Sequence, residues 1–245
     1  MVKLKSGERL YNIVFTLEGI LVRFPLILVN LKTYREGMGE NAVSLTKIAE
    51  QVHLKTGTSI AVAPQAVDVK LVIEAAETPV FAQHIDPAGF GQYTGHILPE
   101  AMAEAGCAGT LINHSERQLP IEVIKNSVRR AKEADLITVV CVDTVEKGRL
   151  VAAFSPDAIA IEPPELIGSG VSVSKAKPEV ISGAVAAVKH VNERIKVLCG
   201  AGVTNGDDVI IAQKLGADGI LVASGVVKAN NPEAALLDLA RSLRH

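Results

Sequence analysis

The chain has 245 residues, 48% of them hydrophobic, and a formal net charge of −2 at pH 7. This length fits one barrel-sized domain or two small domains, and the near-neutral charge argues against nucleic acid or an anionic membrane as the main partner. Only 3% of the residues are aromatic and Trp is absent. A core of Val, Ile, Leu and Ala is typical of parallel strands that are buried on both faces.

The N-terminal segment differs from the rest of the chain. Two lysines precede an apolar run, as in a signal peptide, but Glu18 interrupts the run and no small-residue cleavage site follows. The run from 13 to 22 is also too short to span a bilayer. We therefore expect residues 1–23 to be an extension of unknown role, and residues 24–245 to form the functional domain.

From residue 25 onward, short apolar runs alternate with longer stretches of helical periodicity. Several of these runs are continuously apolar, as expected for strands that are covered on both faces. Eight runs are predicted to be strands: residues 26–30, 59–63, 80–84, 108–113, 136–142, 157–162, 196–200 and 217–222.

The stretches between these runs are predicted to be helices. Residues 41–56 place apolar side chains at close to helical spacing. Asn231 is expected to cap the last helix, residues 232–243. Asp207 and Asp208 fall in the first turn of the seventh helix, where the helix dipole favours negative charge. Prolines stand where a first helical turn can begin, at positions 120, 178 and 232.

Eight repeats of strand and helix predict an α/β fold, a single-domain (β/α)8 barrel of eight parallel strands. A doubly wound open sheet has the same alternation of strands and helices, and it is the second candidate fold. Eight repeats within about 220 residues favour the barrel, which typically needs 200 residues or more. No linker-like or low-complexity stretch divides the chain.

Chemically active side chains follow several of the predicted strands. Asn30 ends the first strand and Lys32 follows it, His114 and Glu116 follow the fourth, and Glu162 ends the sixth. Each residue alone has an ordinary interpretation as a surface charge, a structural histidine or a solvated carboxylate. Because barrel enzymes place their active sites at the carboxyl ends of the strands, their joint placement predicts one active site.

Three segments carry a resemblance to a known family. Residues 30–32 (NLK), 113–117 (NHSER) and 161–170 (IEPPELIGSG) resemble the signature segments of the triosephosphate isomerases, in order and in register. The third segment and the compact length resemble the archaeal branch. The resemblance implies a TIM-barrel isomerase of glycolysis and gluconeogenesis, which interconverts dihydroxyacetone phosphate and D-glyceraldehyde 3-phosphate through an enediolate without a cofactor.

The resemblance also implies catalytic roles. Glu162 matches the base that removes a proton, and His114 matches the electrophile, acting as a neutral imidazole. Asn30 would donate a second hydrogen bond to the carbonyl oxygen, and Lys32 would bind the dianionic substrate, held in place by Glu116. We expect removal from water to raise the pKa of the Glu162 carboxyl.

Phosphate is expected to bind backbone N–H groups in turns of small residues. Many family members have Ser where Gly202 stands and Gly-Gly where Ala223 and Ser224 stand, so a hydroxyl contact is lost at the first position and Ser224 can supply one instead. The loop from 163 to 173 resembles the lid of the family and is expected to exclude water. The substrate-binding residues implied by the resemblance are Asn30, Leu31, Lys32, Ile167, Gly168, Gly202, Ala223 and Ser224.

The spacing of the His, Cys and Gly residues does not favour a metal site or a dinucleotide-binding site. The histidines form no HxxxH pair, the three cysteines match no zinc spacing, and the glycine run at 200–205 lacks the third glycine of a dinucleotide fingerprint. An odd number of cysteines is simplest to interpret as reduced thiols in the cytoplasm. The open alternatives are another phosphate-binding barrel enzyme and a non-catalytic triose-phosphate-binding protein.

The third loop, residues 85–96, corresponds to the loop that family members insert into a partner subunit, with Thr94 as a contact. The resemblance therefore implies a homo-oligomer. Archaeal members are often tetramers, so we expect a homotetramer rather than a dimer, with no nucleic-acid or membrane partner.

Overall fold

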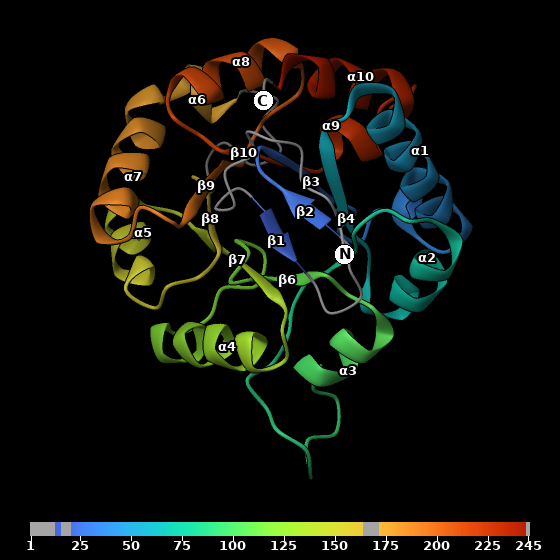
Figure 1. The fold of residues 1–245 in the computed structure, drawn as a ribbon, viewed down its shortest axis with the longest axis vertical. Helices are drawn as coiled ribbons and strands as arrows, with labels where there is room; N and C mark the ends of the chain where they lie inside the picture. Colours follow the sequence, from blue (N-terminus) through green and yellow to red (C-terminus); the bar gives the residue numbers. More distant parts are fainter. Residues whose placement is uncertain (1–12, 16–20, 164–171, 244–245) are drawn as a thin grey trace.

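The computed structural model describes residues 13–15, 21–163 and 172–243. Eight parallel strands form a barrel, and helices surround it as an outer ring (Figure 1). The barrel strands are β3 (Leu26–Asn30), β4 (Ser59–Ala63), β5 (Phe81–Ala82), β6 (Gly109–Ile112), β7 (Ile137–Val142), β8 (Ala158–Ile161), β9 (Lys196–Cys199) and β10 (Gly219–Val222).

The strand order establishes a barrel rather than a doubly wound sheet. Neighbours run β4-β3-β10-β9-β8-β7-β6-β5. A parallel bridge between Val62 and Val80 joins the two end strands, and the Val62 N–H donates to the carbonyl of Pro79 at 3.0 Å. The predicted (β/α)8 fold is therefore confirmed.

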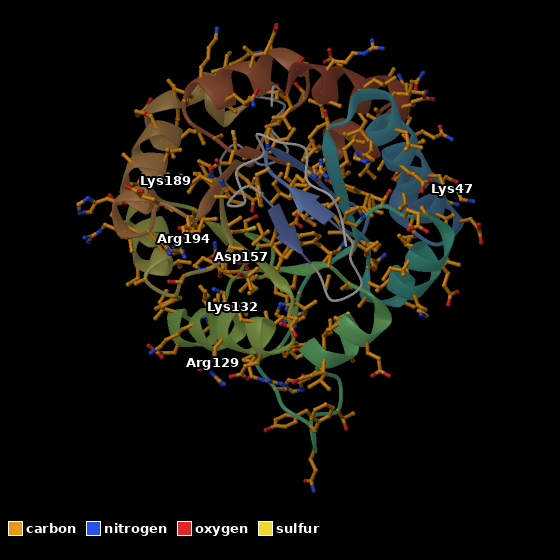
Figure 2. All side chains as sticks on the ribbon, viewed as in Figure 1. Lys47, Arg129, Lys132, Asp157, Lys189 and Arg194 are labelled. Atoms are coloured by element: carbon orange, nitrogen blue, oxygen red, sulfur yellow. The ribbon has the colours of Figure 1, made fainter. Side chains whose placement is uncertain are left out.

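The helices of the outer ring follow the predicted pattern closely. Asn231 caps α10, since its Oδ1 accepts from the Ala234 N–H at 3.0 Å. Charged side chains such as Lys47 and Arg129 lie on the outside of the ring (Figure 2). The helices are α1 (Glu40–Thr56), α2 (Val69–Ala75), α3 (Pro99–Ala105), α4 (Ile121–Glu133), α5 (Val145–Ala152), α6 (Val173–Ala176), α7 (Pro178–Val191), α8 (Gly206–Lys214), α9 (Ser224–Val227) and α10 (Pro232–Ser242), with short 3-10 turns at Arg35–Gly37 and Ala66–Asp68.

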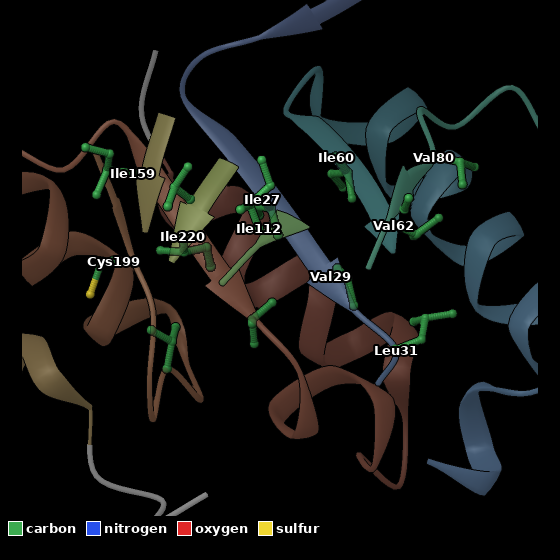
Figure 3. Close-up of a cluster of buried hydrophobic side chains, with 14 of the residues drawn as sticks. Ile27, Val29, Leu31, Ile60, Val62, Val80, Ile112, Ile159, Cys199 and Ile220 are labelled. Atoms are coloured by element: carbon green, nitrogen blue, oxygen red, sulfur yellow. The ribbon is translucent and has the colours of Figure 1, made fainter. Parts of the chain in front are cut away.

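The core has two layers, one on each face of the strands. Leu28 and Phe81 belong to the layer inside the barrel. Ile27, Val29 and Ile220 belong to the layer between the strands and the helices (Figure 3). Successive strand residues point to opposite faces, and both faces are buried, which explains the continuously apolar runs in the sequence.

The third strand is shorter than predicted. The apolar run at 80–84 yields β5 over only Phe81–Ala82. Beyond it, the side chain of Gln83 takes over the pairing, because its Nε2 donates to the carbonyls of Ala63 and Lys32, each at 2.9 Å. A side-chain amide thus joins the carboxyl ends of the first three barrel strands.

An antiparallel hairpin precedes the barrel. It consists of β1 (Ile13–Phe15) and β2 (Leu21–Arg23). Val22 is fully buried in the inner core layer, and the Arg23 N–H donates to Ser59 Oγ at 3.2 Å. Since Ser59 begins β4, strand β2 packs at the end of the barrel where the strands start, opposite the expected active site.

Candidate active site

A cavity of about 210 Å³ opens at the carboxyl ends of the barrel strands. Its size suits a molecule much smaller than a drug-sized ligand. It is lined by Asn30, Lys32, Tyr34, His114, Glu116, Glu162, Ala201, Gly202, Val203, Thr204, Leu221, Val222, Ala223 and Ser224. The strand ends thus bring together the proposed acid–base groups and the turns after β9 and β10.

Asn30 and Lys32 form the part of the site that follows β3. Lys32 adopts a positive φ of 49°, a backbone conformation that is uncommon for a residue with a side chain. Two hydrogen bonds hold it there: its N–H donates to Asn30 Oδ1 at 2.9 Å, and its carbonyl accepts from Gln83. Its Nζ pairs with Glu116 Oε1 at 2.8 Å. The ammonium group is therefore fixed at the cavity wall.

The hydrogen bonds of His114 determine which ring nitrogen carries the proton. The Glu116 N–H donates to His114 Nδ1 at 3.2 Å, so Nδ1 acts as an acceptor. In a neutral imidazole the proton then resides on Nε2. This nitrogen lies 3.5 Å from Glu162 Oε1. The ring can therefore donate a hydrogen bond from Nε2 to a substrate in the cavity.

Glu162 follows β8 and is only 5% exposed. Its N–H continues the barrel ladder to the carbonyl of Val142 at 2.8 Å, which fixes the backbone of the residue. Oε1 faces His114, and Oε2 is buried without a hydrogen-bond partner among the described residues. A carboxylate with one unengaged oxygen in a confined cavity is suited to accept a proton.

The pKa of Glu162 is lowered, and the expectation of a raised value is wrong. Burial alone raises the pKa of this carboxyl, as expected. Hydrogen bonding to His114 and the Cys141 thiol, with the charge of Lys32, favours the ionised form and outweighs burial. The free site therefore holds Glu162 as a carboxylate, ready to act as a base.

The absence of a side chain at Gly200 leaves room for the side chain of Glu162. A Cβ at Gly200 would lie 2.6 Å from Glu162 Cγ, far closer than real carbon contacts. The Gly200 N–H also donates to the carbonyl of Ile161 at 3.0 Å, so the strand cannot easily move away. Position 200 therefore needs a residue without a side chain.

The turns after β9 and β10 form the opposite wall. Ala201 and Gly202 have consecutive positive φ angles of 66° and 69°. A Cβ at Gly225 would lie 2.8 Å from the carbonyl of Val203, so the two turns pack closely. Among the described residues of the cavity wall, Lys32 is the one Lys or Arg. An anion bound here therefore depends largely on backbone N–H groups.

The other predicted site residues are placed differently. Leu31 is fully buried in the outer core layer and does not line the cavity. Ile167 and Gly168, like most of the predicted lid at 163–173, lie outside the described residues. Gln83 and Asp208 contribute contacts to the site that the sequence did not predict. Gln83 donates to the carbonyl of Lys32, and Asp208, expected only as a favourable charge at a helix start, accepts from Thr204.

All three cysteines are free and buried. Burial raises the pKa of the Cys107 and Cys199 thiols to about 12, so neither is a reactive thiolate at neutral pH. Within the described parts of the chain, no group of three or more His, Cys, Asp or Glu residues could hold a metal ion. No helix in those parts is long and apolar enough to cross a membrane.

The chain is similar in sequence to proteins of known function. A sequence model described as "Triosephosphate isomerase" matches residues 25–242. Triosephosphate isomerase of Methanocaldococcus jannaschii is 50% identical over 88% of this chain and 99% of its own length. That of Methanosarcina acetivorans is 50% identical over 89% of this chain and 98% of its own.

A solved structure supports the fold. The crystal structure of triosephosphate isomerase from Bartonella henselae matches with a TM-score of 0.71, at 20% identity, over 90% of this chain and 99% of that one.

Proposed function

Because this chain belongs to the triosephosphate isomerase family, we propose that Glu162 is the base of its reaction, with His114, Asn30 and Lys32 as its catalytic partners. The reaction interconverts dihydroxyacetone phosphate and D-glyceraldehyde 3-phosphate. The observation that carries the assignment is the buried pair of Glu162 and His114, 3.5 Å apart in one cavity with Lys32. A non-catalytic binding protein would not need this pair.

Glu162 begins the reaction by removing a proton from the carbon next to the substrate carbonyl. The electrons of that C–H bond form the carbon–carbon double bond of an enediolate, and negative charge moves to the carbonyl oxygen. His114 Nε2–H donates to this oxygen, and so does Asn30 Nδ2, because Oδ1 of the amide already accepts from Lys32. The protonated Glu162 then returns the proton to the neighbouring carbon, while a proton is exchanged between the two oxygens.

The substrate phosphate is assigned to the turns after β9 and β10. The ammonium group of Lys32 supplies positive charge, and backbone N–H groups at Gly202, Ala223 and Ser224 supply hydrogen bonds. The resemblance adds Ile167 and Gly168 of the sixth loop, which would fold over the phosphate and exclude water. Loss of water strengthens each of these electrostatic interactions.

The third loop supports assembly into a homo-oligomer. It projects away from the barrel (Figure 1), and Phe90 and Tyr93 on it are 79% and 50% exposed. A second cavity of about 280 Å³ beside Lys32 offers a place for the same loop of another copy. Leu150 and Val191, on the adjacent helices α5 and α7, are 52% and 41% exposed, and we propose that they belong to a second apolar surface.

Two apolar surfaces favour a tetramer over a dimer. We also assign the protein to the cytoplasm of an archaeal cell, to glycolysis and gluconeogenesis, with no cofactor, nucleic-acid or membrane partner. Light scattering over a dilution series tests the assembly. A tetrameric mass is expected, and a fully active monomer would contradict the proposed interface.

The catalytic assignment is tested with Glu162→Gln, which keeps the shape and removes the base. Turnover measured with glyceraldehyde 3-phosphate in a coupled assay should fall by about 10³-fold or more, within the range expected for general-base catalysis. Glu104→Gln, the same change at an exposed site on α3, should leave turnover unchanged. Near-normal turnover of a folded Glu162→Gln variant would exclude Glu162 as the base.

A further inference from the structure

We propose that Asp208 is a positioning residue for phosphate binding, joining the turn after β9 to the segment that follows the sixth loop. The proposal rests on the phosphate site assigned above. Asp208 lies in the first turn of α8 and is 1% exposed, although carboxylates are rarely buried without a reason. Each of its two carboxylate oxygens contacts a different segment of the chain.

Oδ2 holds the turn after β9. It accepts hydrogen bonds from the Thr204 N–H at 2.8 Å, the Thr204 hydroxyl at 3.1 Å and the Asn205 N–H at 3.3 Å. Thr204 lines the cavity together with Gly202 and Val203. By fixing Thr204, the carboxylate therefore holds the preceding residues of the turn along the wall where phosphate is expected to bind.

Oδ1 holds the segment after the sixth loop. It pairs with Lys175 Nζ at 2.8 Å. The carbonyl of Asp208 also accepts from the Ser174 hydroxyl at 3.1 Å, and Ser174 Oγ lies 2.8 Å from Ser172 Oγ. Helix α6, which contains Ser174 and Lys175, is thereby attached to the first turn of α8.

The charge of Asp208 makes this arrangement compatible with an anion nearby. Burial raises the pKa of its carboxyl, but contacts with Lys175 and Thr204 lower the pKa by more than burial raises it. The group is therefore ionised at neutral pH. Lys175 neutralises this charge from the side of α6. A bare carboxylate close to a phosphate would repel it, whereas the paired carboxylate fixes the turn without that cost.

The test uses Asp208→Asn, which keeps the shape of the side chain but leaves one oxygen. An amide cannot accept from both Thr204 and Lys175, so one segment loses its attachment. The KM for glyceraldehyde 3-phosphate and the inhibition constant of inorganic phosphate should each rise about tenfold, as for the loss of one hydrogen bond to a charged group. Turnover should change by less than about threefold, because Asp208 does not line the cavity.

Asp207→Asn is the matched control, since Asp207 is the exposed neighbour in the same helical turn and should leave both constants unchanged. Lys175→Met, a change at a 42% exposed side chain, tests the Oδ1 contact without the risk of misfolding. It should raise the phosphate inhibition constant severalfold. If both Asp208→Asn and Lys175→Met bind inorganic phosphate like the wild type, the inference is wrong.

These measurements distinguish failure of the Asp208 proposal from failure of the proposed phosphate site. If inorganic phosphate does not inhibit the wild-type enzyme, the assigned phosphate site fails, and this inference fails with it. If phosphate inhibits the wild type and Asp208→Asn lowers only the melting temperature, Asp208 has a structural role alone. A fall in turnover with unchanged phosphate binding would also overturn the inference.

Discussion

Gly200→Ala is expected to disable the enzyme by displacing the side chain of Glu162. The added Cβ would lie 2.6 Å from Glu162 Cγ, and carbon atoms in contact normally stand about 3.5 Å apart. The side chain must therefore retreat by about 0.9 Å, the difference between these distances. A misplacement of about 1 Å at a reacting group costs roughly 10²-fold in rate, or about 2.7 kcal/mol in the activation barrier.

The assay is turnover with glyceraldehyde 3-phosphate, accompanied by thermal unfolding. Gly183→Ala is the matched control, since its Cβ would lie 3.6 Å from the nearest atom, Val145 Cγ2, which is an ordinary contact. This change within α7 should leave turnover intact and raise stability by roughly 0.5–1 kcal/mol. If Gly200→Ala keeps turnover within about threefold of the wild type, the confinement of Glu162 is not what sets the rate.

Three further predictions concern the ammonium group of Lys32, the packing of Val22 where the barrel strands start, and the ionisation of Glu162. Lys32→Met should raise the KM for glyceraldehyde 3-phosphate by about 10-fold or more, as one hydrogen bond to a charged group is lost; an unchanged KM would contradict the role of Lys32. Val22→Ala should lower stability by about 2 kcal/mol and Tm by roughly 4–8 °C, because Val22 is fully buried; an unchanged Tm would show that β2 does not pack in the barrel. In Cys141→Ala, loss of the thiol hydrogen bond should raise the pKa of Glu162, so the acid limb of kcat/KM should move to higher pH than in the wild type; a shift to lower pH would refute this account of the pKa.

The lowered pKa of Glu162 also makes the stability of the fold depend on pH. Its folded-state pKa lies below the ordinary 4.5. The ionised carboxylate therefore contributes stability above the unfolded-state pKa, and this contribution is lost as the pH falls through the folded-state value. Glu162→Gln should lack this part of the acid destabilisation.

The barrel could be predicted from the sequence because its strands have a strong local signal. Residues 136–142 are apolar except for Thr138, since β7 is buried on both faces. The short β5 could not be predicted in the same way. Its pairing is replaced by hydrogen bonds from Gln83 to the carbonyls of Ala63 and Lys32, and no local pattern records which chain segments meet there.

The candidate site was also predictable only in part. Family motifs identified Glu162 and His114, but not the direction of the Glu162 pKa shift. That direction depends on the positions of His114, Cys141 and Lys32, of which Cys141 lies on β7 and the other two follow β6 and β3. Asp208 was predicted only as a favourable charge at a helix start. Its bonds to Thr204 are local to the start of α8, where Asn205 and Asp208 form a capping box. Its pair with Lys175 arises from the packing of α8 against α6, which sequence spacing does not reveal.

The most direct test of the central claim is solvent exchange at the substrate carbon. In D₂O the wild-type enzyme should incorporate deuterium next to the carbonyl of the triose phosphate, since Glu162 exchanges its proton with solvent before returning it. The Glu162→Gln variant should still bind inorganic phosphate, yet incorporate deuterium at the uncatalysed rate. Incorporation by a folded Glu162→Gln variant at a rate close to that of the wild type would contradict the assignment of Glu162 as the base.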